Sequence, residues 1–227
     1  MLRRARLVSR ARPMNESLRS ACETALRYPM TPHSRRHGPC GYTDDRAYKP
    51  WLRDEFSFRC VYCLSRERWR PDGQEDFAVD HITPQSADPS LAHEYDNLSY
   101  ACCSCNRNRQ DAVLPFDLSR EPIAQHVEFA PDGTAEALSA EGRLLIRICH
   151  LNRPLLVEFR RRLQSLLELL ASRGTTDDER LLRELLGYPS DLPDLASKRP
   201  PRGNTRPSGI AQSSFEQRRS GRLPEVY

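Results

Sequence analysis

The spacing of apolar residues along this 227-residue chain predicts a small mixed unit near its middle. Residues 77–79 and 98–100 alternate apolar and polar side chains as half-buried strands do, and the loop 83–96 separates them. The segment 103–110 contains no helix breaker and follows the second strand directly. We therefore expect a strand, a loop, a returning strand and a short helix, in that order.

Beyond Pro115 the pattern is that of amphipathic helices. We expect helices over residues 140–150, 153–173 and 178–186, the longest of which carries leucines and a phenylalanine at three- and four-residue spacing. Ser139, Asn152 and Asp177 can cap the amino ends of these three helices. Gly174 and Gly187 can end the second and the third.

Both ends of the chain have compositions typical of segments without a core of their own. The first twelve residues hold five arginines and no acid, and residues 1–47 show no sustained hydrophobic period, which predicts a disordered basic leader. An organellar transit peptide, or a start codon assigned too early, would explain the same composition. Residues 188–227 hold six prolines and predict an extended Pro/Arg-rich tail. The structured parts should therefore be residues 48–117 and 118–187.

The overall composition limits the fold to one modest core, since 38% of the residues are hydrophobic and 29% are charged. No run of about 18 apolar residues occurs, which argues against a membrane span. The opening segment also lacks the apolar stretch of a secretory signal. We therefore expect a cytoplasmic protein that does not bind membranes.

The net charge of +4 is unevenly distributed. Residues 1–49 carry eleven basic and four acidic side chains, residues 50–117 carry seven and twelve, and the remainder carries seventeen and fifteen. The middle of the chain is therefore acidic by five charges. Charge alone does not predict a nucleic-acid surface there.

Four of the eight cysteines form two C-x-x-C pairs that predict a structural zinc site. The pairs are Cys60 with Cys63 and Cys102 with Cys105. Two-residue spacing lets both thiolates of a pair reach one ion at about 2.3 Å, and two pairs complete a closed tetrahedral Cys₄ site. A disulfide framework does not suit a chain without a secretory signal, and a redox role does not suit two such pairs outside a βαβ setting.

The other cysteines are weaker candidates for metal binding. Cys103 would leave only a C-x-C spacing with Cys105, so Cys102 is the better ligand. Cys22, Cys40 and Cys149 have no pairing pattern, and we expect ordinary thiols there.

The residues between and just after the two pairs resemble the HNH endonuclease family in its four-cysteine variety. They are the run Val79–Ser86, the segment Tyr95–Leu98 and, after the second pair, Asn106 and Arg109. The resemblance implies an α+β fold in which a ββα-metal unit is stapled by the Cys₄ zinc site and followed by an α-helical C-terminal region. The third position of the motif is Asn106 rather than histidine, which is the H-N-N form.

The resemblance also implies a nuclease site built from Asp80, His81, Asn97 and Asn106. Phosphodiester hydrolysis needs a base that deprotonates water and a cation that neutralises charge on the phosphate, and histidines in general titrate near neutral pH. We predict that His81 is the general base and that Asp80 and the carbonyl oxygen of Asn106 bind a catalytic Mg²⁺ or another divalent ion. Asn97 is predicted to orient the ring of His81 or its loop.

Two arginines of the short helix are candidates for nucleic-acid contact. Arg107 and Arg109 either meet phosphates beside the metal or simply solvate the helix.

The predicted function is a metal-dependent endonuclease that acts on DNA. A zinc module that binds nucleic acid without cleaving it, and a scaffold whose helical part binds another protein, remain alternatives. Asp80, His81 and Asn97 together favour the enzyme, because a pure binder needs no general base. The sequence does not choose between DNA and RNA, and it indicates neither a sequence specificity, nor a pathway, nor an oligomeric state.

Overall fold

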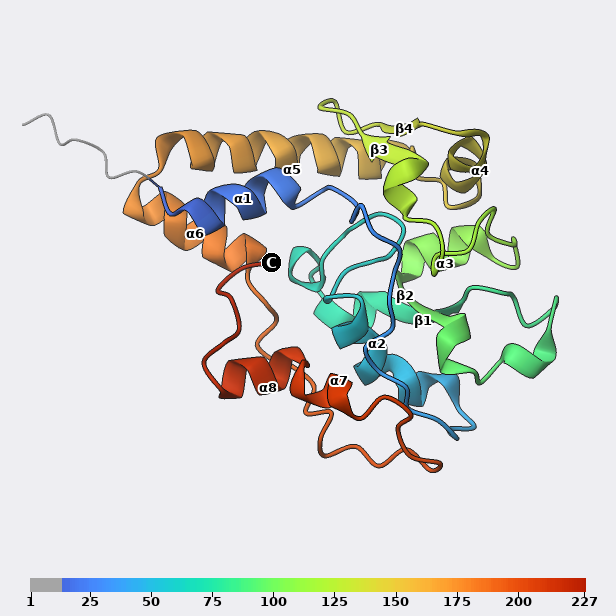
Figure 1. The fold of residues 1–227 in the computed structure, drawn as a ribbon. Coiled ribbons are helices and arrows are strands. Elements are labelled where there is room, and N and C mark those ends of the chain that lie inside the picture. Colours follow the sequence, from blue (N-terminus) through green and yellow to red (C-terminus); the bar gives the residue numbers. More distant parts are fainter. Residues whose placement is uncertain (1–13) are drawn as a thin grey trace, which may run out of the picture.

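The computed structural model describes residues 14–227 and confirms an α+β fold (Figure 1). The five arginines at the start of the predicted leader lie outside the described residues. The helices and strands are α1 (Glu16–Thr24), α2 (Lys49–Glu55), β1 (Phe77–His81), β2 (Leu98–Cys102), α3 (Cys103–Arg109), β3 (Val127–Phe129), β4 (Ala135–Ala137), α4 (Ala140–Ile148), α5 (Pro154–Arg173), α6 (Thr176–Leu186), α7 (Ser208–Ala211) and α8 (Ser214–Arg219). Among residues 14–227, no helix has the length and apolarity that crossing a membrane requires.

The centre of the molecule is the hairpin of β1 and β2 with α3 attached. The strands pair antiparallel, with Asp80 opposite Ser99, and α3 begins directly where β2 ends. The rings of Phe77 and Tyr100 stack at 4.9 Å, and α2 packs its fully buried Trp51 against this unit. The predicted order of strand, loop, strand and helix is confirmed.

A layer of three helices covers one side of this centre. Figure 1 shows α1 beside the long α5 and the antiparallel α6, and all three helices are in mutual contact. The prediction of a disordered leader is therefore wrong for residues 14–47. Asn15 caps α1 by accepting hydrogen bonds from the amides of its first turn, and the buried Leu18 and Ala21 anchor the helix in the core.

The later helices begin at caps that differ in part from the predicted ones. Ser139 caps α4 as expected, and Gly174 ends α5 in the left-handed region, with φ of 59°. Asn152 does not cap α5, because its side chain is bonded to the backbone of β4. The cap of α6 is Thr175, in a capping box with Asp178, rather than Asp177. The small hairpin of β3 and β4 was not anticipated.

The C-terminal segment 188–227, predicted as an extended tail, includes the short helices α7 and α8 and packs tightly on the rest of the protein. Figure 1 shows the chain leaving α6 and forming α7 and α8 beside α2. It then returns to the end of α6. Leu195 is fully buried, and the bridge between Gly187 and Val226 closes the loop. The backbone amide of Ser214 donates to the buried carboxylate of Asp54 in α2. The tail is therefore part of the core rather than a free extension.

Candidate active site and metal centre

The four predicted cysteines form one buried cluster. The thiols of Cys60, Cys63, Cys102 and Cys105 all lie within 4.8 Å of one another. The sulfurs of Cys63 and Cys102 are 3.7 Å apart, close to the roughly 3.8 Å edge of a zinc–thiolate tetrahedron with 2.3 Å bonds. The cluster therefore fits a structural zinc ion, and its fourth member is Cys102 rather than Cys103.

Local backbone geometry shapes the first pair. The amide of Leu64 donates to the carbonyl of Cys60, and Leu64 itself has φ of 58°, which turns the chain back toward the cluster. The amide of Val61 donates to the carbonyl of Tyr100 in β2, so the first knuckle is tied to the strand that supplies Cys102. Backbone hydrogen bonds alone therefore hold the two cysteine pairs close to each other.

The cysteines outside the cluster are placed as the spacing predicted. Cys103 lies at its edge, where its thiol is 3.8 Å from the carbonyl oxygen of Glu75. Cys22, Cys40 and Cys149 are free thiols that do not belong to the four-sulfur group. Arg153, at the start of α5, adds a guanidinium whose two terminal nitrogens are each 3.7 Å from the sulfur of Cys105.

Asp80 lies at the end of β1 with its carboxylate turned inward. One oxygen accepts from Arg109 at 2.6 Å, the other accepts from the hydroxyl of Tyr62, and the residue is 3% exposed. Burial raises the pKa of this carboxyl, while the charge of Arg109 and the Tyr62 hydroxyl act in the opposite direction. A carboxylate has about four lone-pair positions, so Asp80 keeps acceptor capacity for a cation.

His81 follows on the other face of the strand and is held through one ring nitrogen. Its Nε2 lies 2.9 Å from the carbonyl oxygen of Ala92 and 3.7 Å from the carboxylate of Asp45. The amide nitrogen of Gln85, which can only donate, is 3.0 Å from the same nitrogen. The carbonyl of Ala92 and the carboxylate of Asp45 only accept, and the carbonyl is the nearest partner, so in the neutral ring these two acceptors favour the proton on Nε2 and the lone pair on Nδ1.

Asn97 fixes the loop 83–96, whose Ala92 carbonyl contacts the ring of His81. Its side-chain oxygen accepts from the amide of Thr83 at 2.8 Å, and its nitrogen donates to the carbonyls of Thr83 and Leu91. Leu91 directly precedes Ala92, whose carbonyl bonds the ring of His81. The side chain of Asn97 is therefore a clamp across the loop 83–96 and does not touch the histidine itself.

The short helix α3 packs against β1 and presents three candidates in different settings. The half-buried side chain of Asn106 makes no hydrogen bond with residues 14–227, so its amide oxygen is free. Arg107 is exposed. Arg109 is 2% exposed and bonds Asp80 and the carbonyl of Ile82. The phosphate contact predicted for Arg109 does not fit this position, because its guanidinium is occupied inside the protein.

Three features of the site are absent from the sequence predictions. Tyr62 stands inside the first C-x-x-C pair, and nothing in that spacing shows that its hydroxyl bonds Asp80. Asp45 lies in a segment expected to be disordered, and nothing in its spacing points to His81. The third feature is the pairing of Arg109 with Asp80. The sequence could have indicated it, since Asp80 lies in the strand and Arg109 in the helix that the motif brings together.

Comparison with known proteins agrees with this geometry. Residues 60–112 match the model of a protein family described as HNH endonuclease. No curated protein matches the chain. The matched segment begins at the first zinc-site cysteine and ends just beyond α3.

Proposed function

We propose that this chain, whose residues 60–112 form a domain of the HNH endonuclease family, is a divalent-metal-dependent endonuclease that hydrolyses phosphodiester bonds in DNA. The observation that carries the proposal is the setting of His81 at the end of β1. Its Nε2 is bonded to the carbonyl of Ala92, which leaves the lone pair of Nδ1 available to take a proton from water.

The reaction is then an ordinary hydrolysis in which His81 moves one proton. Nδ1 accepts a proton from a water molecule, the water oxygen forms a bond to phosphorus, and the bond from phosphorus to the leaving oxygen breaks. Solvent protonates the leaving oxygen and recovers the proton from His81. Asn97 acts through the loop, because it fixes the segment that carries Ala92.

Asp80 and Asn106 are the residues that would hold a catalytic Mg²⁺ or a similar ion. Carboxylate and amide oxygens suit this ion, which would neutralise charge on the phosphate. Arg109 and Tyr62 fix the carboxylate of Asp80, and the side-chain amide of Asn106 has no competing partner among residues 14–227. The four-thiolate zinc site is closed, so zinc has a structural part only.

The proposal is tested by incubating the zinc-loaded protein with supercoiled plasmid, with and without added Mg²⁺ or Mn²⁺. Nicked and linear products should form only with the added metal, while zinc content stays the same in every sample. Structured and single-stranded RNA tested alongside would show whether DNA is the preferred substrate. Nucleic-acid binding without cleavage in any metal would overturn the proposal in favour of a non-catalytic zinc module.

A further inference from the structure

A groove on the outer side of α3 is not used by the proposed active site. It has a volume of about 520 Å³ and runs between the segment 69–71, α3 and the start of α5. The lining residues that matter here are Trp69, Arg70, Arg107, Arg153, Leu155 and Phe159. The α5 residues lie outside the family match, so this groove joins the HNH domain to the helical C-terminal region.

The groove is lined by three arginines and by no acidic residue. The guanidinium of Arg153 is already bonded to Cys105 and to the carbonyl of His150, so the free positive charge comes from Arg70 and Arg107. Arg107 is exposed and forms neither a hydrogen bond nor an ion pair with the described part of the chain. The only hydrogen bond of the Arg70 side chain within that part goes from Nε to the hydroxyl of Ser65, at 3.1 Å. Because the surrounding segment 50–117 is acidic overall, this local concentration of free positive charge favours an anionic ligand.

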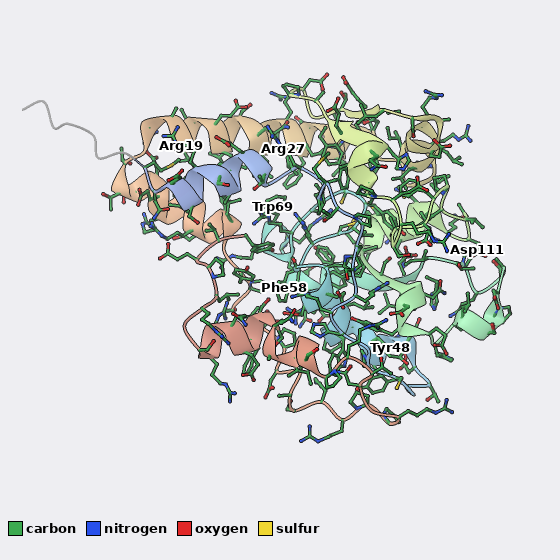
Figure 2. The ribbon with its side chains drawn as sticks, in the orientation of Figure 1. Arg19, Arg27, Tyr48, Phe58, Trp69 and Asp111 are labelled. Carbon is green, nitrogen blue, oxygen red and sulfur yellow. The ribbon has the colours of Figure 1, made fainter. Side chains whose placement is uncertain are left out.

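Aromatic and aliphatic side chains form the remaining wall. Trp69, labelled in Figure 2, donates from its indole nitrogen to the carbonyl of Leu185, and its ring centre is 6.1 Å from that of Phe159. Both rings are half-buried and line the groove, with the guanidinium of Arg66 over one face of Trp69 at 5.1 Å, and the lining residue Leu155 is 80% exposed. Cationic side chains combined with open aromatic rings suit a strand of phosphates and unpaired bases.

We propose that this groove binds a single-stranded segment of the nucleic-acid substrate. Arg70 and Arg107 bind its phosphates, and a base lies against Trp69 and Phe159. Arg107 follows Asn106 in α3, so the groove and the proposed active site share this helix. The inference rests on the proposed nuclease function for the identity of the ligand, but its test does not require cleavage.

The test compares the doubly substituted R70Q/R107Q protein with wild type by fluorescence anisotropy, using a short labelled oligothymidylate without divalent metal. The variant should bind at least about tenfold more weakly. Its plot of log affinity against log salt should be shallower by roughly 0.7 for each lost phosphate contact. The matched control is R143Q/R147Q, which removes the same charge from two exposed positions on α4 and should bind like wild type.

Tryptophan fluorescence reports on the second part of the proposal. Trp51 is fully buried, so quenching by a bound oligonucleotide would come from Trp69. We expect emission to fall as wild type is titrated, and to change little with R70Q/R107Q at the same oligonucleotide concentration. Saturated binding with unchanged emission would overturn the stacking contact.

The outcomes separate this inference from the proposed function. Weakened binding by R70Q/R107Q in a protein that cleaves nothing would support the groove and reject the nuclease. Metal-dependent cleavage with unaltered binding by R70Q/R107Q would reject the groove alone. An equal loss of affinity for a duplex of matched length would overturn the assignment to a single strand.

Discussion

At the residue scale, the pair of Asp80 and Arg109 determines how the candidate site is built. The two side chains are 3% and 1% exposed, and their closest atoms are 2.6 Å apart. A buried ion pair is not in itself strongly stabilising, but removing one partner leaves an uncompensated charge. Arg109 therefore has a positioning role for Asp80, and its charge helps the carboxyl to stay ionised.

The R109M variant should lose about 3 kcal/mol of unfolding free energy, because Asp80 would remain buried without its cation. Urea denaturation measures this loss. R107M is the matched control, since Arg107 leaves the same helix toward solvent and should cost less than about 0.5 kcal/mol. Equal stability of the two variants would mean that the pair does not hold Asp80.

Glu55 provides a prediction on pH dependence. Burial alone would raise the pKa of its carboxyl, but the ring of His33, 3.4 Å away, and hydrogen bonds from the amides of Arg36 and His37 outweigh burial and lower the pKa from 4.5 to about 2. The stabilisation is therefore complete above pH 4.5 and is lost as pH falls toward 2. At about 1.4 kcal/mol per pKa unit it amounts to roughly 3 kcal/mol.

The stability difference between wild type and E55Q should thus be largest above about pH 5 and should shrink steadily toward pH 2. Urea midpoints at several pH values measure it. E94Q is the control, because Glu94 is exposed, and its difference from wild type should stay small throughout. A gap between wild type and E55Q that does not change with pH would contradict this role of Glu55.

At the scale of elements, the four-cysteine cluster, which fits zinc, joins the loop after α2 to the junction of β2 and α3. Binding of structural zinc releases apparent free energies of about 10–16 kcal/mol in small domains, which is comparable to the whole stability of a domain. The C102S variant should therefore lose its zinc and the cooperative unfolding of the hairpin. C103S should keep one zinc per chain, because that thiol lies outside the cluster. Elemental analysis with thermal denaturation distinguishes the two; zinc loss from C103S would contradict the assignment.

The elements of the central unit could be predicted because several local signals agree there. Alternation at Phe77 and Val79, the two cysteine pairs and the absence of a helix breaker after Cys103 each point to the same arrangement. The predicted caps of α5 and α6 are wrong by one or two residues. Asn152 has a side chain suited to capping, but it bonds the backbone of β4, and Asp177 already lies in the first turn of α6, after its cap.

Long-range partners were beyond the reach of the sequence. Helix α1 has nine residues, of which only Leu18, Ala21 and Cys22 are apolar, so it is too short to give a sustained hydrophobic period in the sequence. Asp45 is far from His81 in the sequence and lies near it only in the folded chain. The side chain of Arg109 is buried because it pairs with the carboxylate of Asp80. Such pairings depend on tertiary structure rather than on spacing.

At the scale of the whole molecule, the tail and the segment 14–47 enclose the central unit. Leu195 contributes no exposed surface, so L195A should lose about 2–5 kcal/mol of unfolding free energy. L138A is the matched control, because Leu138 is 51% exposed and its truncation should have little effect. Urea denaturation of both variants checks the prediction, and an unaffected L195A would show that the tail is only loosely attached.

The most direct test of the nuclease proposal compares plasmid cleavage by wild type, H81A and H93A in the presence of Mg²⁺. His93 lies in the same loop region and is exposed, so H93A controls for a general effect of losing a histidine there. With zinc content and unfolding transitions unchanged, H81A should be slower by at least about a hundredfold, and H93A should match wild type. Metal-dependent cleavage by H81A at the wild-type rate would contradict the assignment of His81 as the general base.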